Sequence, residues 1–228
     1  MLPDSLVQRF SRVRTADVSD ALDALGLVDV QIMSPAMRPV WGPGIRAAGR
    51  ARTARLVPSA RQVPRMTPEE YSRRLGEMTD GCYRIMDAVA ADDFLVIDAG
   101  RRAAGFCGSD MIMGLMEKGV RGVAIDGGCR DGYEVGLERG PIWCTVRTCA
   151  HVIGRLKFHS VGEPVNCAGV TVETGDVVVA DDDAVVVVPQ ALAGEAIAIA
   201  EAIIAADKKS RRTHYEKLGL EPDETVSG

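Results

Sequence analysis

The sequence predicts an α/β protein in which short apolar strands alternate with helices, and two segments carry this expectation. Phe94–Ala99 and Gly122–Asp126 are almost wholly apolar, as strands buried on both faces of a sheet are. A helical pattern lies between them, and this strand–helix–strand order is typical of a crossover that joins two parallel neighbours. The 228 residues contain no internal repeat, low-complexity linker or break in composition. We therefore expect residues 1–228 to form a single domain.

Composition narrows the classes of function. Hydrophobic residues make up 46% of the chain and charged residues 26%, the balance of a globular protein. The formal net charge of −5 and the lack of a basic stripe with interleaved aromatic residues argue against nucleic acid as a partner. No apolar run approaches the roughly 18 residues of a membrane span, and the first residues do not resemble a signal peptide. We expect a cytoplasmic protein with no membrane partner.

The cysteines and histidines form no recognisable disulfide or zinc pattern. There is no CxxC pair, and the histidines lack ligand spacing with the cysteines. Without an export signal, reduced thiols are expected. The residues concerned are Cys82, Cys107, Cys129, Cys144, Cys149, Cys167, His151, His159 and His214.

The N-terminal segment is expected to be helical. Apolar residues recur at three- and four-residue spacing over residues 4–25, Ser19 and Asp20 are candidate caps for its second half, and Gly26 is a candidate stop. The stretch 35–44 is rich in Pro and Gly and is expected to form loops.

The next segments are predicted as a strand, a loop and a helix. Gly49–Val57 alternates small or apolar with polar residues and is typical of a strand. A polar loop over Ser59–Glu70 is expected to enter a helix at Tyr71–Ala90. After Phe94–Ala99 we expect a loop over Gly100–Asp110.

The second half of the chain is expected to be rich in short strands and to end in a helix. The expected helices cover about 110–118 and 191–209, and the expected further strands are Ile142–Val146, Val170–Val172, Asp176–Ala180 and Val185–Val188.

The segment Asp126-Gly-Gly-Cys-Arg130-Asp131 is the sharpest local feature. It follows the strand Gly122–Asp126, and ligands in α/β sheets gather at the carboxyl ends of strands. The two glycines permit close backbone approach, Arg130 offers a clamp for a carboxylate, and Asp131 offers a hard oxygen ligand for a divalent ion. The alternative is an ion-paired turn in which Arg130 bonds Asp126 or Asp131.

The segment Gly100–Asp110 has a second candidate role. Its small residues lead into the start of a helix, where free N–H groups favour an anion such as a carboxylate. The alternative is an ordinary helix start capped by Ser109 or Asp110. Because the two segments follow strands that are candidate neighbours in one sheet, a carboxylate cradle and an arginine–metal site would face each other.

Several motifs in the same order resemble the RraA-like family, which includes 4-hydroxy-4-methyl-2-oxoglutarate aldolases, oxaloacetate decarboxylases and regulators of a ribonuclease. The central run is FLVIDAG…GFCGSDMIMGLMEKGVRGVAIDGGCRD, over 94–131. Val18–Leu22 resembles the family's S-D-A-L segment, Gly49–Thr53 its G-R-A-x-T segment, and Cys167–Pro189 its glycine- and aspartate-containing strand pairs. The resemblance covers nearly the whole chain and implies a layered α/β/β/α domain of the swivelling β/β/α type with a C-terminal helix.

The resemblance implies a divalent-metal-dependent carbon–carbon lyase that acts on a small 2-oxo acid. Retro-aldol cleavage and decarboxylation would both leave pyruvate as an enolate, with Mg²⁺ or Mn²⁺ as cofactor. Carried over, Asp131 would ligate the metal, and Arg130 would hold the 2-oxo and carboxylate oxygens. Backbone amides around Gly108–Met111, which include those of Ser109 and Asp110, would bind the carboxylate.

The chain departs from the family pattern at one acidic position, which is Ser109 here. Asp110 is a candidate to replace that acid through a water on the metal. Glu134 matches the family's acidic position three residues after the Arg-Asp pair. The resemblance also implies a homotrimer or homohexamer, in which Asp207 or Glu201 of a neighbouring subunit would approach the metal. For both, exposed helix surface is the alternative.

Other chemistry is disfavoured by the residues themselves. Lys118 is the lysine of the central motifs and lies within a helix, so a Schiff base is less suitable than a metal. No histidine falls near either motif in sequence, which favours water as the base. Cys107 and Cys129 have no adjacent base and are expected to pack.

Substrate specificity is expected in loops such as Ser59–Met66. A non-catalytic regulator that binds a protein partner is the second hypothesis.

Overall fold

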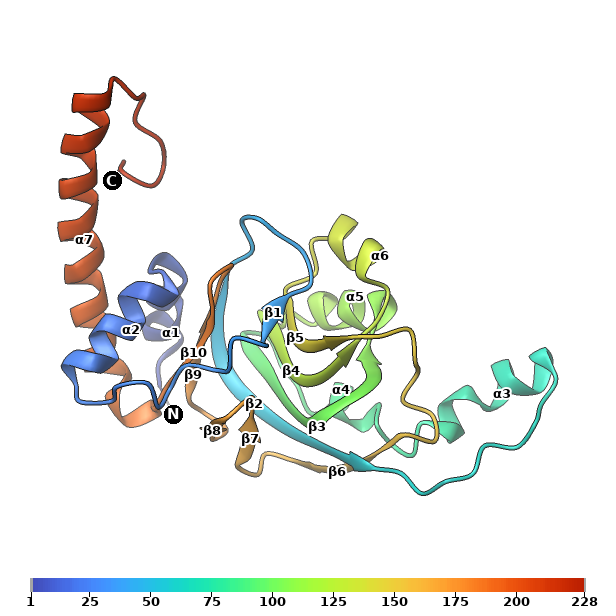
Figure 1. Ribbon diagram of the computed structural model, residues 1–228. Coiled ribbons are helices and arrows are strands. Elements are labelled where there is room, and N and C mark those ends of the chain that lie inside the picture. Colours follow the sequence, from blue (N-terminus) through green and yellow to red (C-terminus); the bar gives the residue numbers. More distant parts are fainter. Residues whose placement is uncertain (1, 228) are drawn as a thin grey trace.

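The computed structural model describes residues 2–227 and shows a curled mixed sheet with helices on both sides (Figure 1). The helices are α1 (Asp4–Arg9), the 3₁₀ helix η1 (Phe10–Arg12), α2 (Thr15–Ala24), α3 (Pro68–Met78), α4 (Arg84–Asp87), α5 (Ser109–Glu117), α6 (Gly132–Leu137), the 3₁₀ helix η2 (Gln190–Leu192) and α7 (Ala193–Leu218). The strands are β1 (Arg38–Pro39), β2 (Ala47–Pro58), β3 (Asp93–Cys107), β4 (Gly122–Cys129), β5 (Ile142–Arg147), β6 (Leu156–Val161), β7 (Val165–Cys167), β8 (Val170–Val172), β9 (Val177–Ala180) and β10 (Val185–Val188).

The main sheet has the order β1-β5-β4-β3-β2-β9-β10, and β6 also pairs with β2. Strands β2, β3, β4 and β5 are parallel neighbours, whereas β9, β10, β6 and β1 join antiparallel. The predicted parallel crossover between Phe94–Ala99 and Gly122–Asp126 is therefore confirmed, with α5 as its helix. Strands β7 and β8 form a separate hairpin.

Alternating side chains divide the interior into three apolar clusters. In β3, Leu95 and Ile97 point into the cluster beneath α4, α5 and α6, whereas Phe94 and Val96 point toward β7 and β8. In β9, Val178 points into that second cluster, while its neighbours pack against α1, α2 and α7 in a third cluster. This succession of helices, sheet, strands and helices is the expected α/β/β/α layering.

The N-terminal helical segment is interrupted, which corrects the expectation for residues 4–25. Val13 is extended, and α2 begins only at Thr15. Asp17 caps this start, because its carboxylate accepts a hydrogen bond of 2.8 Å from the backbone N–H of Arg14. Ser19 and Asp20 lie within the helix and do not cap it.

Two other helices differ in length from the prediction. The helix expected over Tyr71–Ala90 is two short helices, α3 and α4, separated by turns around Gly81, which has a positive φ of 76°. Thr67 and Glu70 form a capping box that starts α3 three residues earlier than expected. Helix α7 continues to Leu218, and in Figure 1 its last turns project away from the sheet, while α3 projects at the opposite end.

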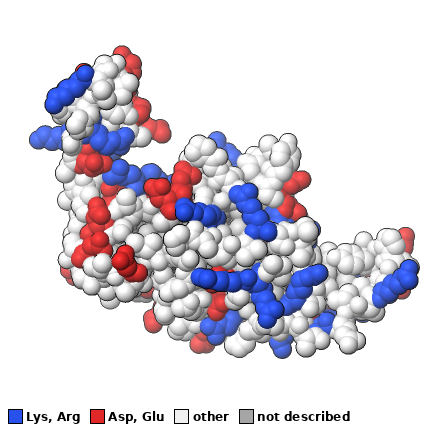
Figure 2. All heavy atoms as spheres, in the orientation of Figure 1, with Lys and Arg blue, Asp and Glu red and all other residues white. Residues whose placement is uncertain are grey.

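Charged side chains are unevenly distributed on the face drawn in Figure 2. Lys and Arg gather over the strand-rich middle, and Asp and Glu gather toward the N-terminal helices. None of the helices within residues 2–227 is long and apolar enough to cross a membrane.

Candidate functional site

The candidate site forms where β3 and β4 lose their regular pairing. Phe94–Asp98 pairs with Gly122–Asp126 without interruption, and the register then shifts three times before Cys107 pairs with Cys129. The prediction of a loop over Gly100–Asp110 is wrong, because β3 continues to Cys107. Gly100 and Arg101 absorb the extra residues in the left-handed region, with φ of 59° and 56°.

Arg130 and Asp131 follow the last residue of β4 directly. The backbone N–H of Arg130 donates to the Cys107 carbonyl over 2.8 Å, which anchors the pair to the end of β3. Asp131 has φ 54° and ψ 40°, a left-handed conformation that aspartate tolerates better than most residues. Its Oδ2 accepts a 3.3 Å hydrogen bond from the Ser109 N–H, and its Oδ1 lies 3.7 Å from the Arg130 Nε. The segments Gly100–Asp110 and Asp126–Asp131 therefore lie against each other, as expected from the sequence.

Two glycines of β3 and its following turn make room for this pair. A Cβ on Gly105 would lie 2.6 Å from the Arg130 Cδ and would overlap its Cγ. A Cβ on Gly108 would overlap the Asp131 Oδ2. Gly128 of β4 is equally constrained, because a Cβ there would lie 2.6 Å from the Ala104 carbonyl oxygen. The side chains of Arg130 and Asp131 thus occupy space that any larger residue would take.

The pair faces a groove with a volume of about 1060 Å³. Among the residues named from the sequence, Gly108, Asp110, Met111, Arg130 and Asp131 line it. Aromatic and sulfur-containing side chains make much of the remaining wall, which comes mainly from α3, α4, α5 and the C-terminal end of β3. These further lining residues include Tyr71, Tyr83, Met86, Phe106 and Met113.

Ser109 does not line this groove with its side chain. Its Oγ donates a 2.6 Å hydrogen bond to Glu138 Oε1, which ties the first turn of α5 to the end of α6. The other carboxylate oxygen of Glu138 is buried and has no partner among the described residues. Ser109 therefore contributes its backbone N–H to Asp131, whereas its hydroxyl serves the contact between two helices.

His151 lines the same groove, which corrects the expectation that no histidine lies near the two motifs. The residue follows β5, and the backbone N–H of Gly105 donates to the carbonyl of its neighbour Ala150 over 2.7 Å. Burial lowers the pKa of His151, and the cations Arg130 and Arg155 lower it further. A neutral ring whose Nδ1 accepts from the Ile153 N–H at 3.3 Å carries its hydrogen on Nε2. The spacing of 21 residues from Arg130 gave no sequence signal for this contact.

Tyr83 lines the groove, whereas the loop Ser59–Met66, in which substrate specificity was expected, does not. Burial raises the pKa of Tyr83, an effect that Arg130 opposes and Asp110 reinforces, so the phenol lies within the field of the site. The loop does not line the groove, and its Arg61 and Val63 instead border a neighbouring hollow that shares His151. The α3–α4 segment, and not this loop, contributes to the wall of the groove.

Few carboxylates surround Asp131 in the described chain. Asp131 is 39% exposed, and Asp110 lines the groove beside it. No cluster of three or more His, Cys, Asp or Glu suited to a metal occurs within residues 2–227. Glu134 is an exposed residue of α6 that does not line the groove. One chain therefore offers one or two carboxylates, a number that suits Mg²⁺ because this ion usually keeps several waters.

Asp207 and Glu201 bind N-terminal arginines in the same chain. Asp207 Oδ2 lies 2.8 Å from an Arg14 guanidinium nitrogen, and Glu201 accepts from Arg9 Nε at 2.8 Å. Both pairs join α7 to the helices at the start of the chain. Their expected approach to a neighbouring subunit's metal stays a prediction.

The cysteines near the site are buried thiols. Burial is the main cause that raises the pKa of Cys107, and a hydrogen bond with Cys144 raises that of Cys129. A thiol whose pKa is raised is a poor nucleophile near neutral pH. Both residues belong to the apolar cluster beneath α5, and all six cysteines are free. These observations agree with the packing role predicted for Cys107 and Cys129.

The fold and this site together define an α/β protein that places an arginine–aspartate pair at the carboxyl ends of parallel strands. A family model described as RraA-like, Aldolase/RraA, matches residues 15–187. The chain belongs to this RraA-like family, as its motifs predicted.

Curated relatives are distant and longer than the matched region. The putative 4-hydroxy-4-methyl-2-oxoglutarate aldolase of Halalkalibacterium halodurans is 29% identical over 108 residues, which cover 47% of this chain and 51% of the relative. Protein DlpA of Legionella pneumophila is 25% identical over 189 residues, which cover 81% of this chain and 28% of the relative. The chain thus spans between about a quarter and about half the length of these relatives.

Solved structures share the fold over most of the chain. RraAS2 of Streptomyces coelicolor, described as an unusual member of the RNase ES inhibitor RraA family, has a TM-score of 0.72 and 29% identity, covering 92% of this chain and 97% of that one. An uncharacterized protein of Pseudomonas syringae has a TM-score of 0.75 and 24% identity, covering 99% and 98%. The relatives' names include both an aldolase and a ribonuclease inhibitor family, so membership leaves the activity open.

Proposed function

We propose that this protein is a divalent-metal-dependent carbon–carbon lyase that forms pyruvate from a small 2-oxo acid. The observation that carries the proposal is the space left by Gly105 and Gly108, here called the glycine cradle, which the side chains of Arg130 and Asp131 occupy in the lining of the groove. We further propose that residues 1–228 act as one domain within a homotrimer or homohexamer. Retro-aldol cleavage of a 4-hydroxy-4-methyl-2-oxoglutarate-like substrate and decarboxylation of oxaloacetate are the two candidate reactions.

Arg130 is suited to bind the substrate's 2-oxo and carboxylate oxygens. Its side chain is 30% exposed and lines the groove, and its Nε has no hydrogen-bond partner among the described residues. A guanidinium can hold two oxygens at once, and its charge would stabilise the negative oxygen that develops as an enolate forms. The backbone around Gly108–Met111 starts α5, and its N–H groups add a second carboxylate-binding element.

The residues present fit Mg²⁺ or Mn²⁺ as the cofactor. Asp131 would hold the ion directly and Asp110 through water, because both residues line the groove. The bound ion would supply a Lewis acid that polarises the 2-oxo group. Asp207 of a neighbouring subunit remains the proposed third carboxylate.

His151 is proposed to orient the substrate rather than to remove a proton. With its hydrogen on Nε2 and a lowered pKa, the ring is a neutral hydrogen-bond donor facing the groove. Such a donor is suited to a hydroxyl or carboxylate oxygen at the end of the substrate that leaves. Tyr83 also lines the groove, and its hydroxyl offers a second hydrogen-bond donor.

A non-catalytic regulator that binds a protein partner is the second candidate function. The specific observation that favours it is Ser109, which stands at the family's acidic position and directs its hydroxyl to Glu138 instead of the groove. The similarity to a structure named for a ribonuclease inhibitor family agrees with this candidate.

The decisive experiment measures pyruvate release from oxaloacetate and from 4-hydroxy-4-methyl-2-oxoglutarate, with Mg²⁺ or Mn²⁺ and after EDTA. Wild type, Asp131→Ala and the matched control Asp20→Ala would be compared, since Asp20 is an exposed aspartate of α2. We expect metal-dependent turnover in wild type and control and a loss of about a hundredfold or more in Asp131→Ala.

The outcomes separate the two candidates. Turnover that survives EDTA would contradict the metal requirement, and equal turnover in Asp131→Ala would contradict the site. No turnover together with no metal binding by calorimetry would reject the lyase and leave the regulator.

A further inference from the structure

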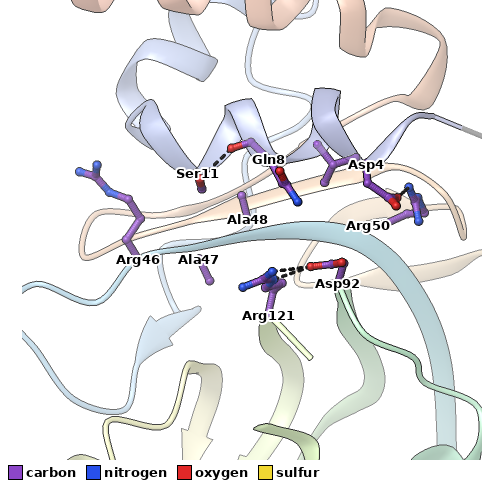
Figure 3. Close-up of a pocket in the computed structure, with 10 residues that line it drawn as sticks. Asp4, Gln8, Ser11, Arg46, Ala47, Ala48, Arg50, Asp92 and Arg121 are labelled. Carbon is purple, nitrogen blue, oxygen red and sulfur yellow. Dashed lines mark hydrogen bonds and ion pairs between the residues drawn. The ribbon is translucent and has the colours of Figure 1, made fainter. Parts of the chain in front are cut away.

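A second pocket lies at the opposite edge of the parallel strands. It is enclosed by α1, the start of β2 and the residues just before β3 and β4 (Figure 3). Its volume is about 250 Å³, which is the liquid volume of about eight waters. A small metabolite fits this space.

Guanidinium groups dominate the lining of this pocket. Arg46, Arg50 and Arg121 line it together with Asp4 and Asp92. Each aspartate is already paired, since Arg50 lies 2.8 Å from Asp4 and the Arg121 Nε donates to Asp92 over 2.7 Å. Three arginines against two aspartates leave an excess of one positive charge, which favours an anion over a cation.

Several donors in the pocket lack acceptors. The Nε of Arg50 is buried and has no hydrogen-bond partner among residues 2–227, and the Arg50 side chain as a whole is only 15% exposed. Arg46 forms no ion pair or hydrogen bond within residues 2–227, and neither does the side-chain amide of Gln8. Figure 3 shows Gln8 pointing from α1 toward the space above Arg121, with Arg50 at one end of the pocket and Arg46 at the other. A buried donor without an acceptor costs free energy that a bound oxyanion would remove.

The pocket is separate from the Arg130–Asp131 groove. Asp92 and Arg121 directly precede β3 and β4, whereas Arg130 directly follows β4. The eight residues of β4 span about 26 Å at 3.3 Å per residue, so a ligand in one site does not touch the other.

We propose that this pocket binds a small metabolite that carries a carboxylate or phosphate group. The oxyanion accepts hydrogen bonds from the free nitrogens of Arg46, Arg50 and Arg121. This site is additional to the proposed lyase site and does not depend on its activity.

Isothermal titration calorimetry on the full chain tests the site, with inorganic phosphate and malonate as probes at constant ionic strength set by chloride. The pocket variants are Arg46→Gln and Arg121→Gln, whose side chains are exposed enough for the fold to tolerate the change. Arg65→Gln is the matched control, an exposed loop arginine outside the pocket, and Arg130→Gln removes the groove's anion binder.

We expect the pocket to bind one anion per chain with similar affinity in wild type, Arg65→Gln and Arg130→Gln, and about tenfold or more weaker in each pocket variant. Any second anion that binds the groove of wild type is expected to be lost in Arg130→Gln and kept in the pocket variants. Preference for phosphate or for malonate identifies the oxyanion group. No binding of either probe up to about 10 mM would overturn the proposal. Loss of all binding in Arg130→Gln, with binding kept in the pocket variants, would also overturn it, because the anion would then occupy the groove.

Discussion

The two halves of the β3–β4 pair differ in almost every respect. In the first half, Phe94–Asp98 and Gly122–Asp126 pair without a break, and nearly all of their side chains are buried. In the second half the register shifts three times, backbone angles become left-handed, and glycines replace large side chains. Regular pairing lets apolar side chains stack on both faces, whereas irregular pairing frees backbone and space for Arg130 and Asp131. One pair of strands thus holds the core at its start and the candidate site at its end.

The largest effect is expected on the free energy of unfolding, from a substitution in the regularly paired half of β3 and β4. Ile97 is fully buried in the cluster beneath α4 to α6, so Ile97→Ala should lower the free energy of unfolding by about 2–5 kcal/mol. Met113→Ala is the control, because that α5 side chain is 46% exposed. Urea unfolding followed by circular dichroism measures both. A loss below about 1 kcal/mol for Ile97→Ala would mean that this half is not the stabilising one.

The irregular half should respond in activity rather than in stability. Gly105→Ala would push the Arg130 side chain out of its place, and a displacement of about 1 Å can cost about a hundredfold in rate. Gly194→Ala, on α7 with no atom within 4 Å of its new Cβ, is the control. Pyruvate release and thermal unfolding would be measured together. If both variants keep full activity, the cradle does not position Arg130.

A smaller effect on activity is expected from His151, which lies in the segment after β5 and pairs with the second half of β3. His151→Gln should raise KM by up to about tenfold with little change in kcat, because the ring binds substrate and does not take a proton. His159→Gln, on exposed β6, is the control. A large fall in kcat with unchanged KM would instead assign His151 to the chemical step.

The smallest effect on stability is expected from a substitution in α7, far from both halves of the β3–β4 pair. Asp207→Asn removes a half-exposed ion pair with Arg14, which should cost about 0.2–1 kcal/mol of unfolding free energy. Stability would be compared with that of Asp23→Asn on α2. A loss of pyruvate-forming activity well beyond this change in stability would support the proposed role of Asp207 at a neighbouring subunit's metal.

Much of the regular half was predictable from local pattern. Apolar runs marked β3, β4, β9 and β10, and the motif order predicted the layered fold, because burial on both faces requires continuous apolar residues. The irregular half was not predictable in the same way. Residues 100–106 resemble a loop in composition, and they form a strand only because β4 and residue 150 supply hydrogen-bond partners.

The sequence by itself determined the family, the layered α/β class and the adjacency of Arg130 and Asp131, since each depends on residues close together in the chain or on repeated local pattern. Only the tertiary structure decided that His151 faces the groove, that the Ser109 hydroxyl bonds Glu138, and that the α3–α4 segment forms part of the groove's wall. These contacts join segments distant in sequence, and their positions follow from strand register and helix packing, which leave no periodic signal in the chain.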